Sequence, residues 1–239
     1  MTAKIIFFDF DGTIANTRDT FIEIVNGLSG EFGYKPVNQE DIEHFKNLSS
    51  REIIKQSKIS LIQIPFLLRR VKIELNQKIS TLEPFIGLSA CLHQLISKGY
   101  TLGIITSNLE KNVITFLQNN ELDHLFKFIY CDTSLFGKDK VINQIIRKNN
   151  FKRENIIYVG DETRDISAAR KSNIKSIAVA WGFNSPQILT KYEPDVLIYS
   201  PQDLIKAVES LTEKVIIPSR DIHQSFQLTI SQKGDEIRI

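Results

Sequence analysis

The sequence of 239 residues predicts an α/β protein that has a mostly parallel sheet, helices on both faces of the sheet and one all-helical insertion. Three observations predict this class. Short apolar runs alternate along the chain with segments of helical periodicity, which is typical of a three-layer arrangement. One long interval after the first apolar run contains helical spacing alone. Polar residues follow directly after several apolar runs, where such sheets bind their ligands.

The first expected strand covers residues 5–8. These residues are Ile-Ile-Phe-Phe, a continuous apolar run rich in β-branched and aromatic side chains, which is the composition of a strand buried on both faces. Five later runs have a similar character. They cover residues 101–105, 128–131, 156–159, 177–180 and 196–199.

Segments with helical spacing separate these runs. Helical spacing is clear at Leu88, Leu92, Leu95 and Ile96, then at Val141, Ile145 and Ile146, then at Ile166, Ala169 and Arg170. A repeated order of strand, helix and strand favours parallel pairing through right-handed crossovers. The sequence therefore predicts a Rossmann-like, three-layer core with a parallel sheet.

Residues 18–82, between the first and second expected strands, contain helical spacing only. Ser49 and Glu52 have the spacing of a capping box at one helix start. An interval of about 65 residues is long for a crossover, so we expect a separate helical cap over the strand ends. We divide the chain into a core of residues 1–17 and 83–211, a cap of residues 18–82 and a C-terminal extension of residues 212–239.

Composition excludes several classes of partner. The chain has 30 Lys and Arg against 28 Asp and Glu, a net charge of +2, so it lacks the positive excess that nucleic acid or an anionic membrane attracts. No segment approaches the roughly 18 apolar residues of a membrane span. Cys91 and Cys131 are too few for a disulfide framework and are expected in the core. We expect a cytoplasmic protein that binds a small molecule, not nucleic acid or a membrane.

Four polar clusters follow expected strands. The first, Asp-Phe-Asp-Gly-Thr, contains Asp9 and Asp11, which share one face of an extended segment and so can enter one pocket. The second is Thr106, Ser107 and Asn108, whose hydroxyl and N–H groups at a helix start can bind an anion. Together they place acids beside an anion site.

The third cluster is Gly-Lys-Asp-Lys, in which Lys138 lies just before the helix expected from Val141. The fourth, Gly-Asp-Glu-Thr-Arg-Asp, places Asp161 at a strand end and Asp165 one helical turn later, so that both point the same way. Converging carboxylates repel one another, so they need a counter-charge, which a divalent cation can supply. Mg²⁺ is suited to this position because it binds carboxylate oxygens and a substrate phosphate at the same time. An aspartate can then attack phosphorus, while Lys138 and the Thr106 hydroxyl offset the charge of the phosphoryl group.

The order of these four motifs resembles the haloacid dehalogenase superfamily of phosphohydrolases. The helical insertion resembles the small C1-type cap of that superfamily, and the resemblance covers about residues 1–210. Segments 84–87 and 181–183 resemble the phosphoglycolate phosphatase branch. The resemblance implies that Asp9 is the nucleophile and Asp11 the general acid and base.

The resemblance also implies the ligand sites. Mg²⁺ would be held by Asp9, the backbone carbonyl of Asp11 and Asp161, with Asp165 supporting the metal directly or through water. Phosphate would be bound by Thr106 and Lys138, with help from Ser107 and Asn108. Many relatives have Lys-Pro in the third motif where this chain has Lys-Asp-Lys, so Lys140 is an alternative to Lys138.

These observations predict a Mg²⁺-dependent phosphomonoesterase that acts through an aspartyl-phosphate on a small metabolite, either phosphoglycolate-like or a sugar phosphate. A phosphomutase of the same superfamily is the alternative; it would exclude water from the phosphoenzyme, whereas a phosphatase admits it. A dehalogenase is disfavoured by the second acid, Asp11. A phospho-receiver is disfavoured because its acid would lie on the third strand of a smaller domain, and a silent binding protein because no catalytic position is replaced.

Several further residues carry weaker expectations. Arg51 lies in a Ser-Ser-Arg-Glu segment that faintly resembles a substrate loop of the mutases, so we expect a cap contact to the substrate. Lys55 and Arg69 are other cap cations, whereas Glu162 and Arg164 are expected to be structural or solvent-facing. In the extension, residues 215–218 are typical of a short apolar strand that proline ends. Residues 226–230 and 237–239 alternate as strands do on either side of a turn signal at 233–235, which predicts a hairpin that packs on the core or on a second copy in a homodimer.

Overall fold

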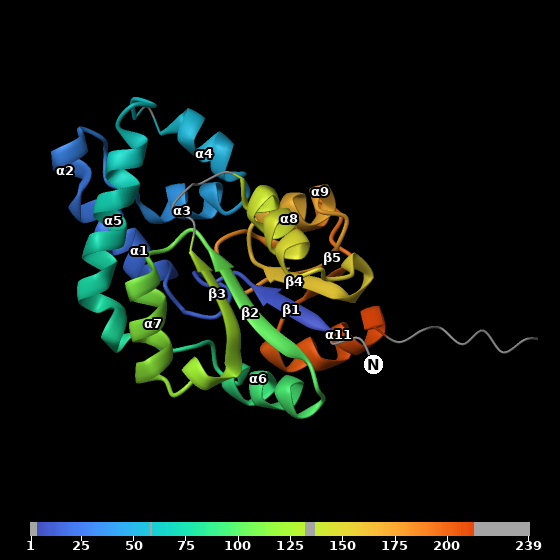
Figure 1. Ribbon diagram of the computed structural model, residues 1–239. Coiled ribbons are helices and arrows are strands. Elements are labelled where there is room, and N and C mark those ends of the chain that lie inside the picture. The colour runs from blue at the N-terminus through green and yellow to red at the C-terminus, as the bar shows by residue number, and fades with distance from the viewer. Residues whose placement is uncertain (1–3, 58, 132–136, 213–239) are drawn as a thin grey trace, which may run out of the picture.

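The computed structural model describes residues 4–57, 59–131 and 137–212. Its centre is a six-stranded parallel sheet in the order β3-β2-β1-β4-β5-β6 (Figure 1). The strands are β1 (Ile5–Phe8), β2 (Thr101–Thr106), β3 (Phe126–Cys131), β4 (Ile156–Gly160), β5 (Lys175–Val179) and β6 (Val196–Ile198). The predicted parallel sheet is confirmed, and each of the six apolar runs forms or overlaps one of these strands.

Strand β1 lies between β2 and β4 and sets the position of the strand ends. Phe8, its last residue, is level with Ile104 of β2 and with Val159 of β4. Because all three strands are parallel, the segments that follow them leave the sheet at the same edge. The polar clusters after these strands are thereby brought together.

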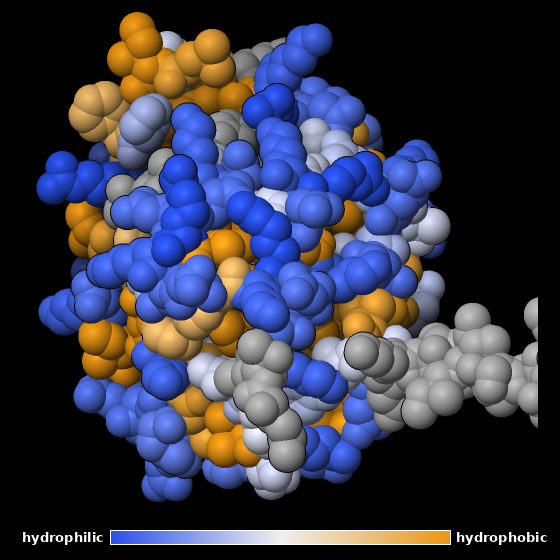
Figure 2. All heavy atoms as spheres, turned by 45° about the vertical axis from the view of Figure 1, so that its right-hand side comes forward, coloured by the Kyte–Doolittle hydropathy of each residue, from blue (hydrophilic) through white to orange (hydrophobic). Residues whose placement is uncertain are grey.

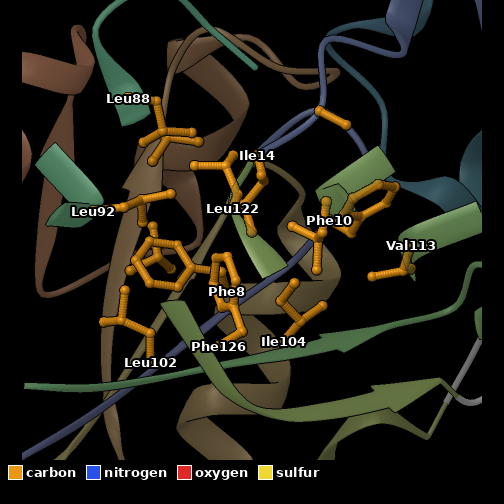
Figure 3. Close-up of a cluster of buried hydrophobic side chains, with 14 of the residues drawn as sticks. Phe8, Phe10, Ile14, Leu88, Leu92, Leu102, Ile104, Val113, Leu122 and Phe126 are labelled. Atoms are coloured by element: carbon orange, nitrogen blue, oxygen red, sulfur yellow. The ribbon is translucent and has the colours of Figure 1, made fainter. Parts of the chain in front are cut away.

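Alternate side chains of β1 enter two different core layers. Ile6 and Phe8 pack into the larger apolar cluster, which Figure 3 shows around Phe8, Leu92 and Phe126. Ile5 and Phe7 pack on the opposite face. The larger cluster includes residues of α6 (Leu88–Ser97), α7 (Glu110–Asn119) and α11 (Leu204–Thr212), and the opposite layer those of α8 (Lys138–Lys148) and α9 (Thr163–Lys171).

The segment of residues 18–82, between β1 and helix α6, is helical, as predicted. It contains α1 (Arg18–Gly27), α2 (Ser29–Phe32), α3 (Gln39–Phe45), α4 (Ser50–Gln56), α5 (Ile64–Lys78) and the 3₁₀ turn η1 (Ile79–Thr81). The predicted capping box at the start of α4 is confirmed: Ser49 N donates to Glu52 Oε2 over 2.7 Å, and Glu52 N donates to Ser49 Oγ over 3.4 Å. Figure 1 shows these helices grouped beside the sheet. The division of the chain at residues 18 and 82 stays a proposal.

The remaining described elements complete the connections of the core. They are α10 (Pro186–Lys191) and the 3₁₀ turns η2 (Asp123–Leu125), η3 (Arg153–Asn155) and η4 (Pro201–Asp203). Within the described ranges, no helix combines the length and apolar character that crossing a membrane requires. On the face drawn in Figure 2, hydrophilic side chains predominate and hydrophobic ones gather near the top.

Three details differ from the sequence predictions. Helix α8 begins at Lys138 rather than at Val141, because apolar spacing detects only the buried positions of a helix and misses a polar first turn. Helix α6 buries Cys91 while Ile96 stays 38% exposed, so Ile96 is not a core position. Cys131 is only half-buried. The predicted C-terminal hairpin lies outside the described residues.

Candidate active site

Two acids follow β1, and their side chains have different partners. Asp9 is 1% exposed, and its Oδ1 accepts a hydrogen bond from Phe10 N over 2.8 Å. The side chain of Asp11 lies against Asn108, whose Nδ2 donates to Asp11 Oδ1 over 3.0 Å and to Oδ2 over 2.9 Å. The sheet edge thus presents two carboxylates with separate surroundings.

Asp9, Asp161 and Asp165 form a buried acidic cluster. One carboxylate oxygen from each of the three lies within 4.8 Å of the others, whereas the carboxylate of Asp11 is not part of the group. Lys138 lies beside them, with its Nζ 2.6 Å from Asp165 Oδ1 and 2.9 Å from Asp9 Oδ2. One lysine therefore contacts two of the three acids.

The loop after β1 and the loop after β5 hold Asp161 from two sides. Thr13 Oγ1 donates to Asp161 Oδ1 over 2.7 Å, and Phe183 N donates to Asp161 Oδ2 over 2.7 Å. Both loops approach so closely that a Cβ on Gly12 or on Gly182 would collide with the Asp161 carboxylate, and Gly12 also has a φ of +76°. The position of Asp161 is therefore fixed by backbone that only glycine allows.

Burial and mutual repulsion shift the titration of these groups. Burial, followed by the Asp9 charge, raises the pKa of Asp11 from 3.8 to about 7, although the Asn108 hydrogen bond opposes this. Burial raises the pKa of Asp165 to about 6 against the effect of Lys138, and burial with neighbouring acids raises the pKa of Asp161 well above its usual value. Burial alone lowers the pKa of Lys138, but Asp165 and Asp9 raise it well above its usual value.

The acidic cluster fits a divalent cation. Among the described residues, Asp9 Oδ2 is a buried atom with no hydrogen-bond donor, since its contact with Lys138 has the distance of an ion pair but not the angles of a hydrogen bond. Three carboxylates with a single lysine leave excess negative charge, which adds to the effect of burial in raising the pKa of Asp161 and of Asp165. Hard divalent cations prefer carboxylate oxygens of this kind.

The second cluster lies at the end of β2. Thr106 is 2% exposed, and its Oγ1 accepts a hydrogen bond from Asn108 N over 3.1 Å. Asn108 is also buried, and half-buried Ser107 lies between them in the chain. Of the two candidate lysines, Lys138 reaches the acids, whereas Lys140 is exposed.

Sequence reasoning missed two buried amides in this region. Asn112, on α7, is 0% exposed and its Nδ2 donates to Asn108 Oδ1 over 2.9 Å. Asn184, in the loop after β5, is 5% exposed and accepts a hydrogen bond from Thr163 N over 2.9 Å. No motif or periodicity marks either residue, because an isolated asparagine in a helix or loop is ordinary.

The insertion contacts the core beside the acids. Ser50 Oγ, at the start of α4, donates to Glu162 Oε2 over 2.7 Å, and Arg164 Nη2 lies 2.6 Å from Glu162 Oε1 (Figure 1 shows α4 near α8 and α9). The side chains of Glu162 and Arg164 are only 15% and 17% exposed, so of the two expected roles, structural or solvent-facing, their burial favours the structural one. Packing of α4 over this loop excludes them from water.

A cavity of about 180 Å³ lies at this contact between insertion and core. Basic side chains from both parts line it, and Asp139 is an acid in the same wall. The basic lining residues are Arg51, Lys138, Arg164 and Lys171. The structure thus places Arg51 in the same cavity wall as Lys138.

Comparison with known proteins shows to which family this chain belongs. The family model of haloacid dehalogenase-like hydrolases matches residues 6–179. A phosphoglycolate phosphatase of Synechococcus elongatus is 37% identical over 206 residues, which cover 86% of this chain and 97% of the relative. The pyrophosphatase PpaX of Listeria innocua is 25% identical, over 87% of this chain and 98% of its own. A solved hydrolase of the haloacid dehalogenase-like family from Streptococcus pneumoniae superposes with a TM-score of 0.71 at 25% identity, covering 86% of this chain and 98% of that chain.

Proposed function

Because this chain belongs to the family of haloacid dehalogenase-like hydrolases and is a phosphatase, we propose that it is a Mg²⁺-dependent phosphomonoesterase that acts through an aspartyl-phosphate. The observation that carries the proposal is the buried cluster of Asp9, Asp161 and Asp165 with Lys138 as its only close lysine among the described residues. Such a cluster needs a cation, and it lies where three parallel strands end.

Asp9 is the proposed nucleophile. Its carboxylate attacks phosphorus, a bond forms between Asp9 and phosphorus, and the bond from phosphorus to the ester oxygen breaks. Asp11 gives its proton to the departing alcohol, then accepts a proton from the water that cleaves the aspartyl-phosphate into Asp9 and inorganic phosphate. The pKa of about 7 for Asp11 supports this role, because both of its protonation states are then available near neutral pH.

The remaining residues bind and orient. Mg²⁺ would be held by Asp9, Asp161 and the backbone carbonyl of Asp11, with Asp165 directly or through water, and when bound it would offset the charge of the carboxylates and of the phosphoryl group. The hydroxyl of Thr106 and the ammonium of Lys138 would bind the phosphate oxygens, with Ser107 and Asn108 nearby.

The proposed substrate is a small phosphorylated metabolite, phosphoglycolate-like or a sugar phosphate. The name of the Synechococcus relative supports the first class. The basic lining of the cavity supports a small anionic compound, and we assign Arg51 as its contact from the insertion. A cytoplasmic location, the lack of nucleic-acid and membrane partners, and a homodimer formed through residues 212–239 stay predictions from sequence.

A phosphate-release screen with purified protein tests the proposal. The panel contains phosphoglycolate, sugar phosphates, an alkyl phosphate and p-nitrophenyl phosphate, each assayed with Mg²⁺, with a chelator and after Mg²⁺ is restored. We expect release that the chelator stops and Mg²⁺ recovers. Release that a chelator leaves unchanged, or no release from any monoester, would overturn the proposal.

A further inference from the structure

A chain of amide hydrogen bonds through the buried residues Asn112 and Asn108 connects the helical insertion to Asp11. Asn76 Nδ2, on α5, donates to Asn112 Oδ1 over 2.7 Å. Asn112 Nδ2 donates to Lys72 O of α5 over 2.9 Å and to Asn108 Oδ1 over 2.9 Å. Asn108 Nδ2 in turn donates to both carboxylate oxygens of Asp11.

The direction of each bond in this chain follows from its neighbours. The backbone N–H of Leu109 can only donate, and it donates to Asn108 Oδ1 over 2.7 Å, which identifies this atom as the amide oxygen. The NH₂ group of Asn108 is thereby presented to Asp11, whichever protonation state that carboxyl group has. Both hydrogens of Asn112 Nδ2 have acceptors and its Oδ1 has a donor, so a flip of either amide would set acceptor against acceptor.

From this geometry we propose that Asn112 is a positioning residue for Asp11, acting through Asn108 and tying the placement of the general acid to helix α5. Asn112 is fully buried, and its side-chain hydrogen bonds are to Asn76, Lys72 and Asn108. When the Nδ2 group of Asn112 is removed, Asn108 Oδ1 keeps only its hydrogen bond from Leu109 N. The Asn108 side chain, whose NH₂ group holds Asp11, is then less firmly oriented. The inference rests on the proposed function, in which Asp11 protonates the leaving alcohol.

The test compares two substrates in one preparation of each variant. An alkyl phosphate needs a proton on its leaving group, whereas p-nitrophenyl phosphate does not. We expect Asn112→Ala to lower kcat for the alkyl phosphate about 10-fold more than kcat for the aryl phosphate, because misplacing a general acid removes part of an effect of about 10²- to 10⁴-fold, while KM changes little. The ratio of the two rates does not depend on the folded fraction, and Asn112→Ser serves as a less disruptive second variant.

Asn120→Ala is the matched control. Asn120 follows the same helix α7, and its Nδ2 donates to Leu82 O over 3.1 Å and to Phe116 O over 2.9 Å, with no bond to Asn108. We expect the control to change both rates equally. Asp11→Asn is the reference and should show a selective loss of kcat for the alkyl phosphate at least as large as that in Asn112→Ala.

The outcomes separate the inference from the function on which it rests. A selective loss in Asp11→Asn together with equal losses in Asn112→Ala and Asn112→Ser would overturn the role of Asn112 and leave Asp11 as the acid. If Asp11→Asn lowers kcat equally for the alkyl and the aryl phosphate, Asp11 is not the general acid, and the inference is overturned as well. A selective loss in Asn120→Ala as large as that in Asn112→Ala would also overturn the inference.

Discussion

Thr13 donates its hydroxyl hydrogen bond to Asp161 over 2.7 Å, although 148 residues separate the two in the chain. The bond joins the loop after β1 to the end of β4, and these two strands are neighbours in the sheet. Asp161 is therefore oriented by the protein before any ligand binds. Such preorganisation favours catalysis, because the enzyme need not reorganise during the reaction.

Replacing the proposed nucleophile should abolish turnover. We expect Asp9→Asn to reduce release of phosphate from p-nitrophenyl phosphate at least about 1,000-fold, because the amide cannot form the covalent intermediate. A single-turnover assay with circular dichroism of the same sample checks activity and folding together. The control is Asp19→Asn, since the Asp19 side chain is 85% exposed on α1. Near-normal turnover in Asp9→Asn would contradict the assignment.

The metal-free protein should lose stability as pH rises. The pKa of Asp11 is raised to about 7 in the folded protein from 3.8, and that of Asp165 to about 6, so between pH 4 and 7 the folded state binds more protons than the unfolded chain. The free energy of unfolding therefore falls across this range as these acids ionise. Tm measured with a chelator at pH 5 and at pH 7.5 should show the fall, and Asp11→Asn should show a smaller one. Equal falls in the two proteins would contradict the shift at Asp11.

Arg51 should control affinity for small acidic substrates. We expect Arg51→Ala to raise KM for phosphoglycolate about 10-fold, because a hydrogen bond to a charged group contributes about 1.5–3 kcal/mol, while KM for p-nitrophenyl phosphate changes little. Steady-state kinetics with both substrates provide the measurement. Lys55→Ala is the control, since Lys55 is an exposed cation on the same helix α4. Equal changes in KM for the two substrates would argue against a contact from Arg51.

Asn184 should hold the insertion on the core. Its Oδ1 accepts from Thr163 N, and its Nδ2 donates to Leu48 O over 3.0 Å and to Lys46 O over 3.3 Å. We expect Asn184→Ala to lower the free energy of unfolding by about 1–3 kcal/mol, because buried polar groups lose their partners. The Thr163 amide should also exchange its hydrogen faster.

Chemical denaturation and amide hydrogen exchange check the Asn184 prediction against Thr190→Ala. The hydroxyl of Thr190, an exposed residue of α10, donates to Pro186 O of the same helix over 2.7 Å, so its loss should have little effect. Equal free energies of unfolding in the two variants, or unchanged exchange at Thr163 in Asn184→Ala, would show that Asn184 does not fasten the insertion.

Local pattern was sufficient for the sheet and for the location of the site. Strand β1 covers residues 5–8 as predicted, because a strand buried on both faces requires a continuous apolar run. The capping box at Ser49 could also be predicted, since its two bonds join residues three apart. Once the strands were assigned, parallel pairing alone required the residues after β1, β2 and β4 to share an edge.

The sequence by itself determined which elements form, and through them which polar clusters meet at one edge of the sheet. Only the tertiary structure decided the partners of each side chain: Asp11 faces Asn108 rather than the acidic cluster, Lys138 rather than Lys140 reaches Asp165, and Asn112 bonds to α5. The physical reason is the separation along the chain of the residues that interact. Secondary structure follows from neighbours within a few residues, whereas a hydrogen bond across the core depends on how helices from distant parts of the chain pack, which periodicity does not record.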